Sequence, residues 1–433
     1  MNKLSLLFLA FIATNSFAQK QKIVITEDIP NFWNAYDQIK QTKDSLQQIE
    51  LIKTLFINKG TQGLAAIMEV KEYTPISYIN AINQYPDFWN SIRNNTLKVN
   101  GYAYEIETGI KQLKRIYPAL KPAKIYFTIG ALWSNGTTLG DKVLIGSELA
   151  MANVKVITKE IEKDFPHLPI YFNTNPIDNL TFLNTHEYIH TQQKTTVGNS
   201  LLAQTVLEGA AEFIAEIALK IKSPNPQIQF GKSHTNQLKK AFEKEMFSPY
   251  LYNWIWNNAN NPFKMRDLAY CIGYAICEKY YIESSNKKLA IQEMIELDYN
   301  KETALIDFVE KANFFEKPLS FYKTQFEHER PKLVGIKQFE NGSQIVDPAT
   351  KIITLYFSQP MNINTRGFEF GPLGENNILM VKKVLGFSED KKSFSFEVQL
   401  EPQKRYQSII SERFRDTSGL PLKAFLIDFK TKE

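Results

Sequence analysis

The sequence predicts an α+β fold, in which a mainly helical region carries a small β-sheet and is followed by an all-β region. Apolar residues recur at helical spacing over most of residues 20–326, and two strand-like segments interrupt them at 123–129 and 142–149. From residue 333 onward, alternation with a period of two residues takes over. A chain of 433 residues is long enough for two or three domains.

The composition is that of an ordinary soluble globular protein, with 43% hydrophobic and 22% charged residues. The net charge of +5 is small, and no basic cluster is interleaved with aromatic residues, so we expect no nucleic-acid partner. Cys271 and Cys277 lie on different faces of a predicted helix, which favours two small core residues over a disulfide.

Residues 1–18 are predicted to be a signal peptide. Lys3 supplies the charged start, residues 4–12 form an apolar segment too short to span a bilayer, and residues 16–18 form a small-residue cleavage site. No later segment reaches transmembrane length. We therefore expect an exported protein in a bacterium, located in the periplasm, at the cell surface or outside the cell.

Residues 19–120 are predicted to form an N-terminal helical region. Residues 30–34 and 86–90 each place a proline and a polar residue before two aromatic residues, a pattern typical of a helix start. A further amphipathic helix is expected at 102–117. After the two strand segments, a short helix is expected at 154–164.

The most informative segment is His186-Glu187-Tyr188-Ile189-His190, on a helix predicted to begin near Pro176. Residues four apart lie on the same face of a helix, so His186 and His190 can present two imidazoles to one metal ion. Glu187 can then face a water bound to that ion. The alternative is an amphipathic helix whose histidines are polar surface residues.

A second helix is predicted at 200–219, after a polar turn. If the two helices are antiparallel, His190 lies about 8 Å before the turn and Glu208 about 13 Å after it, which brings them to a similar level. Glu208 is then a candidate third ligand, and Glu212 a carboxylate next to a ligating histidine. The alternative is that both glutamates belong to a solvated stripe at i, i+4 spacing that continues to Lys220.

The pattern H-E-Y-x-H followed by E-G-x-A-E resembles the gluzincin metallopeptidases, the group that contains thermolysin and the zinc aminopeptidases. It is more similar to a set of largely uncharacterised secreted zinc proteases that also carry Y-x-x-G-Y, here at residues 270–274. This resemblance covers about residues 120–285 and implies a zincin-like metallopeptidase domain at 121–328. It implies Zn²⁺ bound by His186, His190 and Glu208, with Glu187 as general base and Glu212 orienting His186.

The resemblance also implies hydrolysis of a peptide or protein substrate by a zinc-activated water. Tyr274 is then the candidate donor to the developing oxyanion, with Tyr270 as a competitor and a packed tyrosine as the alternative. An edge strand that binds extended peptide is implied as well, and the alternative there is an ordinary core strand. The candidate edge residues are Val143, Leu144, Ile145, Gly146 and Ser147.

The C-terminal region at 331–433 is predicted to be a β-sandwich, from about a hundred residues of short strands. The expected strands are 333–338, 352–357, 378–385, 393–400, 406–410 and 424–429. Residues 357–361 and 416–422 resemble segments of bacterial Ig-like modules. Such modules space, dock or bind, which suggests an association with the cell surface.

Two functions remain open from the sequence. The first is an exported zinc metallopeptidase with an Ig-like accessory domain. The second is a non-catalytic binding or surface-assembly protein on a peptidase-like scaffold, with the metal structural or absent. The intact H-E-x-x-H favours the first, because a structural zinc site has no need of Glu187.

Overall fold

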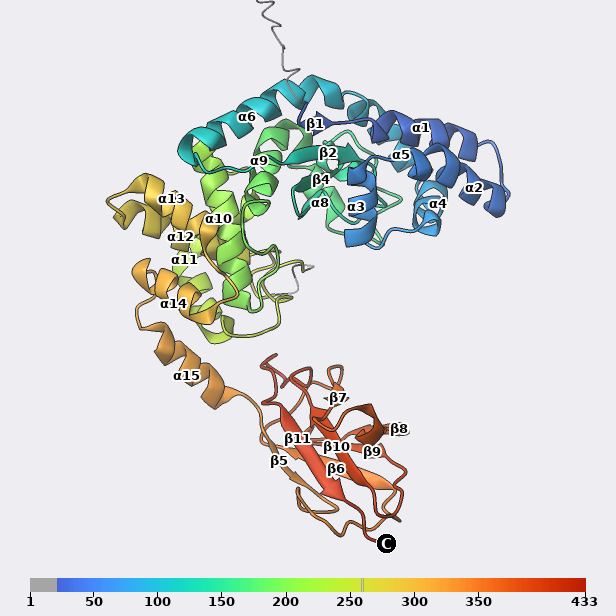
Figure 1. Cartoon of the computed structure of the whole chain (residues 1–433), viewed down its shortest axis with the longest axis vertical. Helices are drawn as coiled ribbons and strands as arrows, with labels where there is room; N and C mark the ends of the chain where they lie inside the picture. Colours follow the sequence, from blue (N-terminus) through green and yellow to red (C-terminus); the bar gives the residue numbers. More distant parts are fainter. Residues whose placement is uncertain (1–21, 258, 260) are drawn as a thin grey trace, which may run out of the picture. The chain divides into compact units, whose positions relative to one another are not determined.

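The computed structural model describes residues 22–257, 259 and 261–433 (Figure 1). The predicted signal peptide lies outside the described residues. The chain divides into two compact units between Gln192 and Gln193. Helices and small sheets occur together, which confirms the predicted α+β class.

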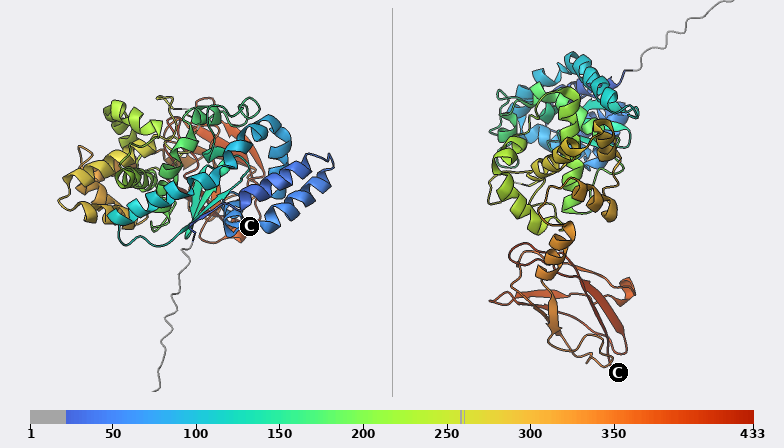
Figure 2. Two further views of the ribbon diagram at one scale, coloured as in Figure 1. Left: turned by 90° about the horizontal axis from the view of Figure 1, so that it is seen from above. Right: turned by 90° about the vertical axis from the view of Figure 1, so that its left-hand side faces the viewer.

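The first unit begins with a helical layer, as the sequence predicts. Its helices are α1 (Asp28–Ile39), α2 (Ser45–Leu55), α3 (Gln62–Val70), α4 (Pro75–Gln84), α5 (Pro86–Thr96) and α6 (Ala103–Ile116), drawn blue to cyan in Figure 2. Asp44, Thr61 and Thr74 cap the helices that follow them by accepting backbone N–H groups. The aromatic residues at the two similar helix starts pack together, since the rings of Phe32 and Trp89 lie 5.1 Å apart.

The sheet of this unit has the order β1-β2-β4-β3. Its strands are β1 (Val24–Ile25), β2 (Lys124–Thr128), β3 (Gly136–Leu139) and β4 (Lys142–Gly146). β1, β2 and β4 run parallel, while β3 is antiparallel to β4. The two-residue strand β1 was not predicted, because two residues are too few to show an alternation.

This topology corrects the prediction of an edge strand at Val143, Leu144, Ile145, Gly146 and Ser147. β4 pairs with β2 on one side and with β3 on the other, so it is an interior strand. Ser147 lies outside the strand and begins the short helix α7 (Ser147–Ala150). Among the described residues, β3 is the outer strand at this end of the sheet.

Two short helices lead to the candidate metal-binding helix. Residues 154–164 form turns rather than the predicted helix, and α8 follows at Leu168–Phe172. A 3-10 turn at Pro176–Asn179 then leads into α9 (Leu180–His190). α9 packs against α6, as Figure 1 shows, and it also contacts β3 and β4.

The second unit starts with helices. These are α10 (Leu201–Leu219), α11 (Pro226–Glu245), α12 (Ala269–Glu283), α13 (Lys287–Glu296), α14 (Glu302–Lys311) and α15 (Leu319–Glu329). α10 is buried on nearly every side, and Ser200 caps it by accepting the N–H of Ala203 at 3.2 Å. Gly209 of α10 and Gly273 of α12 let the two helix backbones approach closely. Cys271 and Cys277 are both free and buried.

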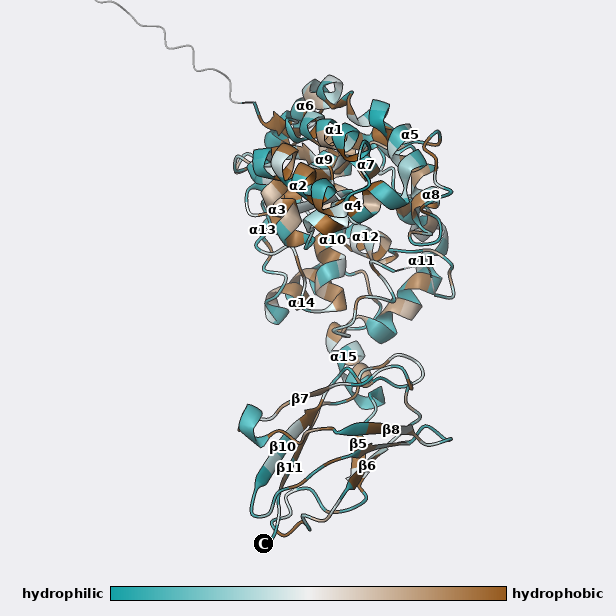
Figure 3. Cartoon of the chain, turned by 90° about the vertical axis from the view of Figure 1, so that its right-hand side faces the viewer, coloured by the Kyte–Doolittle hydropathy of each residue, from teal (hydrophilic) through white to brown (hydrophobic). Residues whose placement is uncertain are grey.

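The rest of the second unit contains two antiparallel sheets, with the orders β5-β6-β9-β8 and β11-β10-β7. The strands are β5 (Leu333–Ile336), β6 (Ile352–Phe357), β7 (Phe368–Phe370), β8 (Lys383–Phe387), β9 (Ser393–Glu397), β10 (Arg405–Ile410) and β11 (Phe425–Lys430). All but β7 fall at or close to the predicted segments. Burial alternates along β6 and β9, as expected for strands with one buried face, and Figure 3 shows both brown and teal segments within these sheets.

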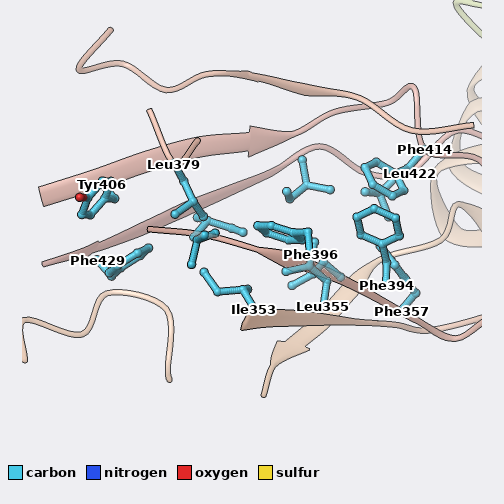
Figure 4. Close-up of a cluster of buried hydrophobic side chains, with 14 of the residues drawn as sticks. Ile353, Leu355, Phe357, Leu379, Phe394, Phe396, Tyr406, Phe414, Leu422 and Phe429 are labelled. Atoms are coloured by element: carbon cyan, nitrogen blue, oxygen red, sulfur yellow. The ribbon is translucent and has the colours of Figure 1, made fainter. Parts of the chain in front are cut away.

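Both sheets contribute to one hydrophobic core. Ile353 and Leu355 of β6 and Phe394 of β9 belong to it, together with Ile427 and Phe429 of β11. Figure 4 shows several of these side chains pointing towards one another between the strands. Within the described part of the chain, no helix has both the length and the apolar character needed to cross a bilayer.

Candidate metal centre

The two histidines of α9 face the same point. Four residues separate them, so they lie one turn apart on one side of the helix. Their Nε2 atoms are 3.0 Å apart, and each residue is only 6% exposed. The rings meet edge to face, with centroids 4.7 Å apart.

Glu208 of α10 completes a group of three possible ligands. The atoms offered by His186, His190 and Glu208 all lie within 4.8 Å of one another, and all three side chains are buried. The structure therefore brings the three predicted metal ligands together.

The geometry of this group fits a divalent metal ion. Two nitrogen ligands at ordinary Zn–N lengths in a tetrahedral site are separated by about 3.3 Å, close to the observed Nε2–Nε2 distance. Two imidazoles and one carboxylate also form a donor set that catalytic zinc sites use, with one position left for another ligand.

Gln204 supports Glu208 from one turn earlier on α10. Its Nε2 donates to Oε1 of Glu208 at 2.9 Å, and its own side-chain oxygen accepts the N–H of Gly198 at 2.6 Å. Gln204 is fully buried, so this amide holds the carboxylate in a set orientation. Gln204 was not predicted from the sequence, although its i−4 spacing from Glu208 places both on one face of the helix.

Glu187 lies against the β3 backbone. A Cβ atom at Gly136 would lie 2.7 Å from Oε1 of Glu187, which shows how tightly the carboxylate packs on this strand. Glu187 is 8% exposed. The structure therefore places the predicted general base next in sequence to a candidate ligand and beside the outer strand of the sheet.

The charge of Glu187 affects the pKa values of two residues, Lys71 and Tyr171. Neither was singled out from the sequence. Burial lowers the pKa of Lys71, and the charge of Glu187 opposes this shift. Burial raises the pKa of Tyr171 to about 12, against a lowering hydrogen bond from Asn135, and Glu187 adds to the rise. Tyr171 is therefore a neutral phenol at physiological pH, and its oxygen accepts from Nδ2 of Asn135 at 2.9 Å.

The backbone N–H and C=O groups of successive β3 residues point alternately towards β4 and towards the outer side of the sheet. The N–H of Gly146 in β4 donates to the carbonyl of Asn135 at 3.2 Å, and the antiparallel register pairs Thr137 with Leu144. Hydrogen-bonded pairs recur at every second residue in such a ladder. The N–H and C=O groups of Gly136 and Thr138 therefore point away from β4.

Glu212 is fully buried and holds the loop after α10. Its Oε1 accepts from the hydroxyl of Ser223, and from Nδ2 of Asn225 at 2.8 Å. The role predicted for Glu212, to orient His186, stays a prediction.

Tyr274 lies beside acidic side chains, and the oxyanion role predicted for it stays a prediction. Its hydroxyl donates to Oε1 of Glu278 at 3.4 Å, and burial together with the charges of Glu278 and Glu216 raises its pKa. Glu216 follows Glu208 by two turns of α10, or about 12 Å along the axis, so this hydroxyl is directed to another level of the helix. Spacing along α12 could not reveal this, because it does not say which neighbouring carboxylates a tyrosine will meet.

Comparison with known proteins does not assign the chain to a family. No family model and no curated protein matches the sequence. Among solved structures, the chain is similar to the crystal structure of the S-layer protein rSbsC(31-844), at 15% sequence identity and a TM-score of 0.19. The match covers 64% of this chain and only 39% of that one, and a likeness this weak does not bear on fold or function.

Proposed function

We propose that this protein is an exported zinc-dependent metallopeptidase of the gluzincin type, which hydrolyses peptide bonds. The observation that carries the proposal is the buried group of His186, His190 and Glu208, with ligand atoms within 4.8 Å of one another. Glu187 strengthens it, because a purely structural metal site has no use for a further buried carboxylate beside it.

His186, His190 and Glu208 would hold the metal. Two neutral imidazoles and one carboxylate leave a net charge of +1 on a divalent ion, so its Lewis acidity is retained. Zinc bound there would polarise a substrate carbonyl and lower the pKa of water towards ~7. Gln204 would keep the Glu208 carboxylate aimed at the ion.

Glu187 is the proton carrier in this proposal. As general base it takes a proton from the attacking water, and it then delivers that proton to the nitrogen of the leaving amine. Its packing against Gly136 limits the directions in which the carboxylate can point. A general base held in this way loses little orientational freedom when the substrate arrives.

The outer strand β3 is the element best suited to hold the substrate backbone. An extended peptide can add to the outer strand of a sheet by main-chain hydrogen bonds, here through Gly136, whose N–H points away from β4. In this proposal β3 replaces β4 as the peptide-binding edge, and it brings the peptide next to Glu187.

The finer architecture belongs to the same proposal. The helices and sheet around the metal ligands would form a zincin-like domain, and the two packed sheets at 333–430 an Ig-like module. Such a module would serve for docking to the cell surface, since none of the residues proposed for catalysis lies within it.

A metal analysis combined with a cleavage assay tests the proposed function. The full chain should bind one zinc ion and cleave a broad peptide library, and a chelator should abolish cleavage until zinc is restored. Glu187→Gln should keep the zinc and lose turnover. Stoichiometric zinc without any cleavage would instead favour the non-catalytic binding protein, and cleavage by the chelated protein would exclude the metal mechanism.

A further inference from the structure

The loop between β2 and β3 presents an exposed tryptophan close to the proposed active site. Trp133 is 71% exposed, three residues before Gly136, which packs against Glu187. Three residues of extended chain span about 10 Å at most, so the indole is within reach of a peptide bound at Glu187.

A buried carboxylate anchors the start of this loop. Glu148 is fully buried and accepts the N–H of Gly130 at 2.9 Å and that of Leu132 at 3.2 Å. The hydroxyl of Tyr78 donates to the carbonyl of Ile129 at 3.2 Å. These bonds leave the first half of the loop little freedom.

Side chains also fix the end of the loop. Ser134 Oγ donates to the carbonyl of Gly136 at 2.9 Å, and Asn135 Nδ2 donates to the hydroxyl of Tyr171 at 2.9 Å. Trp133 therefore lies between two anchored segments. The hydrogen bonds at both ends restrict the motion of the loop.

The residue before Trp133 has an unusual backbone conformation. Leu132 has a φ of 70°, in the left-handed region that a leucine rarely adopts, while its side chain is only 1% exposed. Strain of this kind persists where the surroundings over-determine the conformation, and it clusters at functional sites. The turn buries the side chain of Leu132 and leaves that of Trp133 in water, although exposing the larger apolar surface of Trp133 costs more free energy.

The indole is supported from one side and open on the other. Its ring meets Phe165 edge to face, with centroids 6.5 Å apart. A rigid, exposed aromatic residue is a typical anchor for a binding partner, because it offers a large contact area at little entropic cost.

We infer that Trp133 is a specificity-determining residue, which binds a large apolar side chain of the peptide lying along β3. The inference rests on the proposed peptidase function and adds a substrate class to it. Successive side chains of an extended peptide alternate in direction, so a peptide paired with β3 would place one side chain near the indole while its main chain passes Glu187.

Substrate profiling tests the role of Trp133. The wild-type chain should prefer a large apolar residue at one position relative to the cleaved bond, and Trp133→Ala should lose about tenfold or more in kcat/KM for such peptides. The loss should appear in KM, with kcat kept, and Trp133→Phe should recover part of it. Tyr104→Ala is the matched control, since Tyr104 is 76% exposed on α6. An unchanged preference in Trp133→Ala would overturn the inference.

A binding readout separates this inference from the proposed function. In the full chain labelled with 5-fluorotryptophan, the resonance that disappears in Trp133→Phe should shift when an apolar peptide is added to the Glu187→Gln variant, and should not shift with a peptide rich in Asp. A shift in a chain that never cleaves peptide would support the docking site and refute the peptidase. Cleavage by the wild type with no shift in this resonance would support the peptidase and overturn the role of Trp133.

Discussion

Gly136 and Glu187 are packed so closely that a Cβ atom at position 136 would lie 2.7 Å from Oε1 of the glutamate and 3.0 Å from its Cδ and Cγ atoms. A larger residue at position 136 would therefore have to displace the side chain of Glu187. The backbone of β3 thereby limits the positions open to the carboxylate of the proposed general base.

Gly136→Ala should consequently displace Glu187 and lower turnover while zinc stays bound. A shift of about 1 Å in a catalytic group can cost on the order of 100-fold in rate, so we expect a loss of tenfold or more in kcat. Gly101→Ala is the control, because no atom lies within 4 Å of a Cβ there. Full activity in Gly136→Ala would show that Glu187 does not need this position.

Glu208→Ala should weaken zinc binding, as measured by competition with a chelator of known affinity. Loss of a supporting residue typically costs 10–100-fold in metal affinity, so loss of a direct ligand should cost more than about 100-fold, and Gln204→Ala about 10–100-fold. Glu216→Gln, two turns further along α10, should keep zinc. Stoichiometric, tight zinc in Glu208→Ala would assign the third ligand elsewhere, with Glu212 as the first alternative.

Gly209→Ala should destabilise the helical part of the second unit. A Cβ atom at Gly209 would lie 2.0 Å from the carbonyl carbon of Gly273, so the two backbones would have to move apart. Overpacking of this kind costs about 1–3 kcal/mol in the free energy of unfolding. Zinc affinity should fall too, because Glu208 precedes this contact. The urea midpoint of Gly209→Ala should be compared with that of Gly101→Ala. Equal midpoints would contradict the close approach of the two helix backbones.

Glu148 should make the stability of the fold depend on pH. Burial raises the pKa of its carboxyl from 4.5 to about 7, while the backbone N–H groups of Gly130 and Leu132 oppose the rise. The folded chain keeps this proton to a higher pH than the unfolded chain, so the associated stability is full below pH 4.5 and is lost as the pH rises through 7. The loss is on the order of 3 kcal/mol.

Glu148→Gln removes this dependence. With a chelator present, the free energy of unfolding of the wild type should fall relative to Glu148→Gln between pH 5 and pH 8. A difference between the two proteins that is the same at both pH values would contradict a raised pKa for Glu148.

Local features of the sequence determined most helices and the pair of imidazoles proposed to bind metal. Each of these signals depends on a few neighbouring residues: helical spacing, the cap at Ser200 and the strand alternation in 352–357. The helices and strands form where these local patterns lie. The i, i+4 spacing of His186 and His190 likewise follows from helix geometry alone. These predictions succeed because the interactions that produce them are short in sequence.

Only the tertiary structure decided which strand forms the edge of the sheet and what surrounds Glu187. β4 is interior because β2 and β3 pair with its two sides, and the charge of Glu216 on α10 affects the pKa of Tyr274 on α12. Gly136, Trp133 and Tyr171 approach the proposed site through contacts between segments far apart in the chain. No local pattern records such contacts, because strand order and packing depend on which distant surfaces fit together when the core closes.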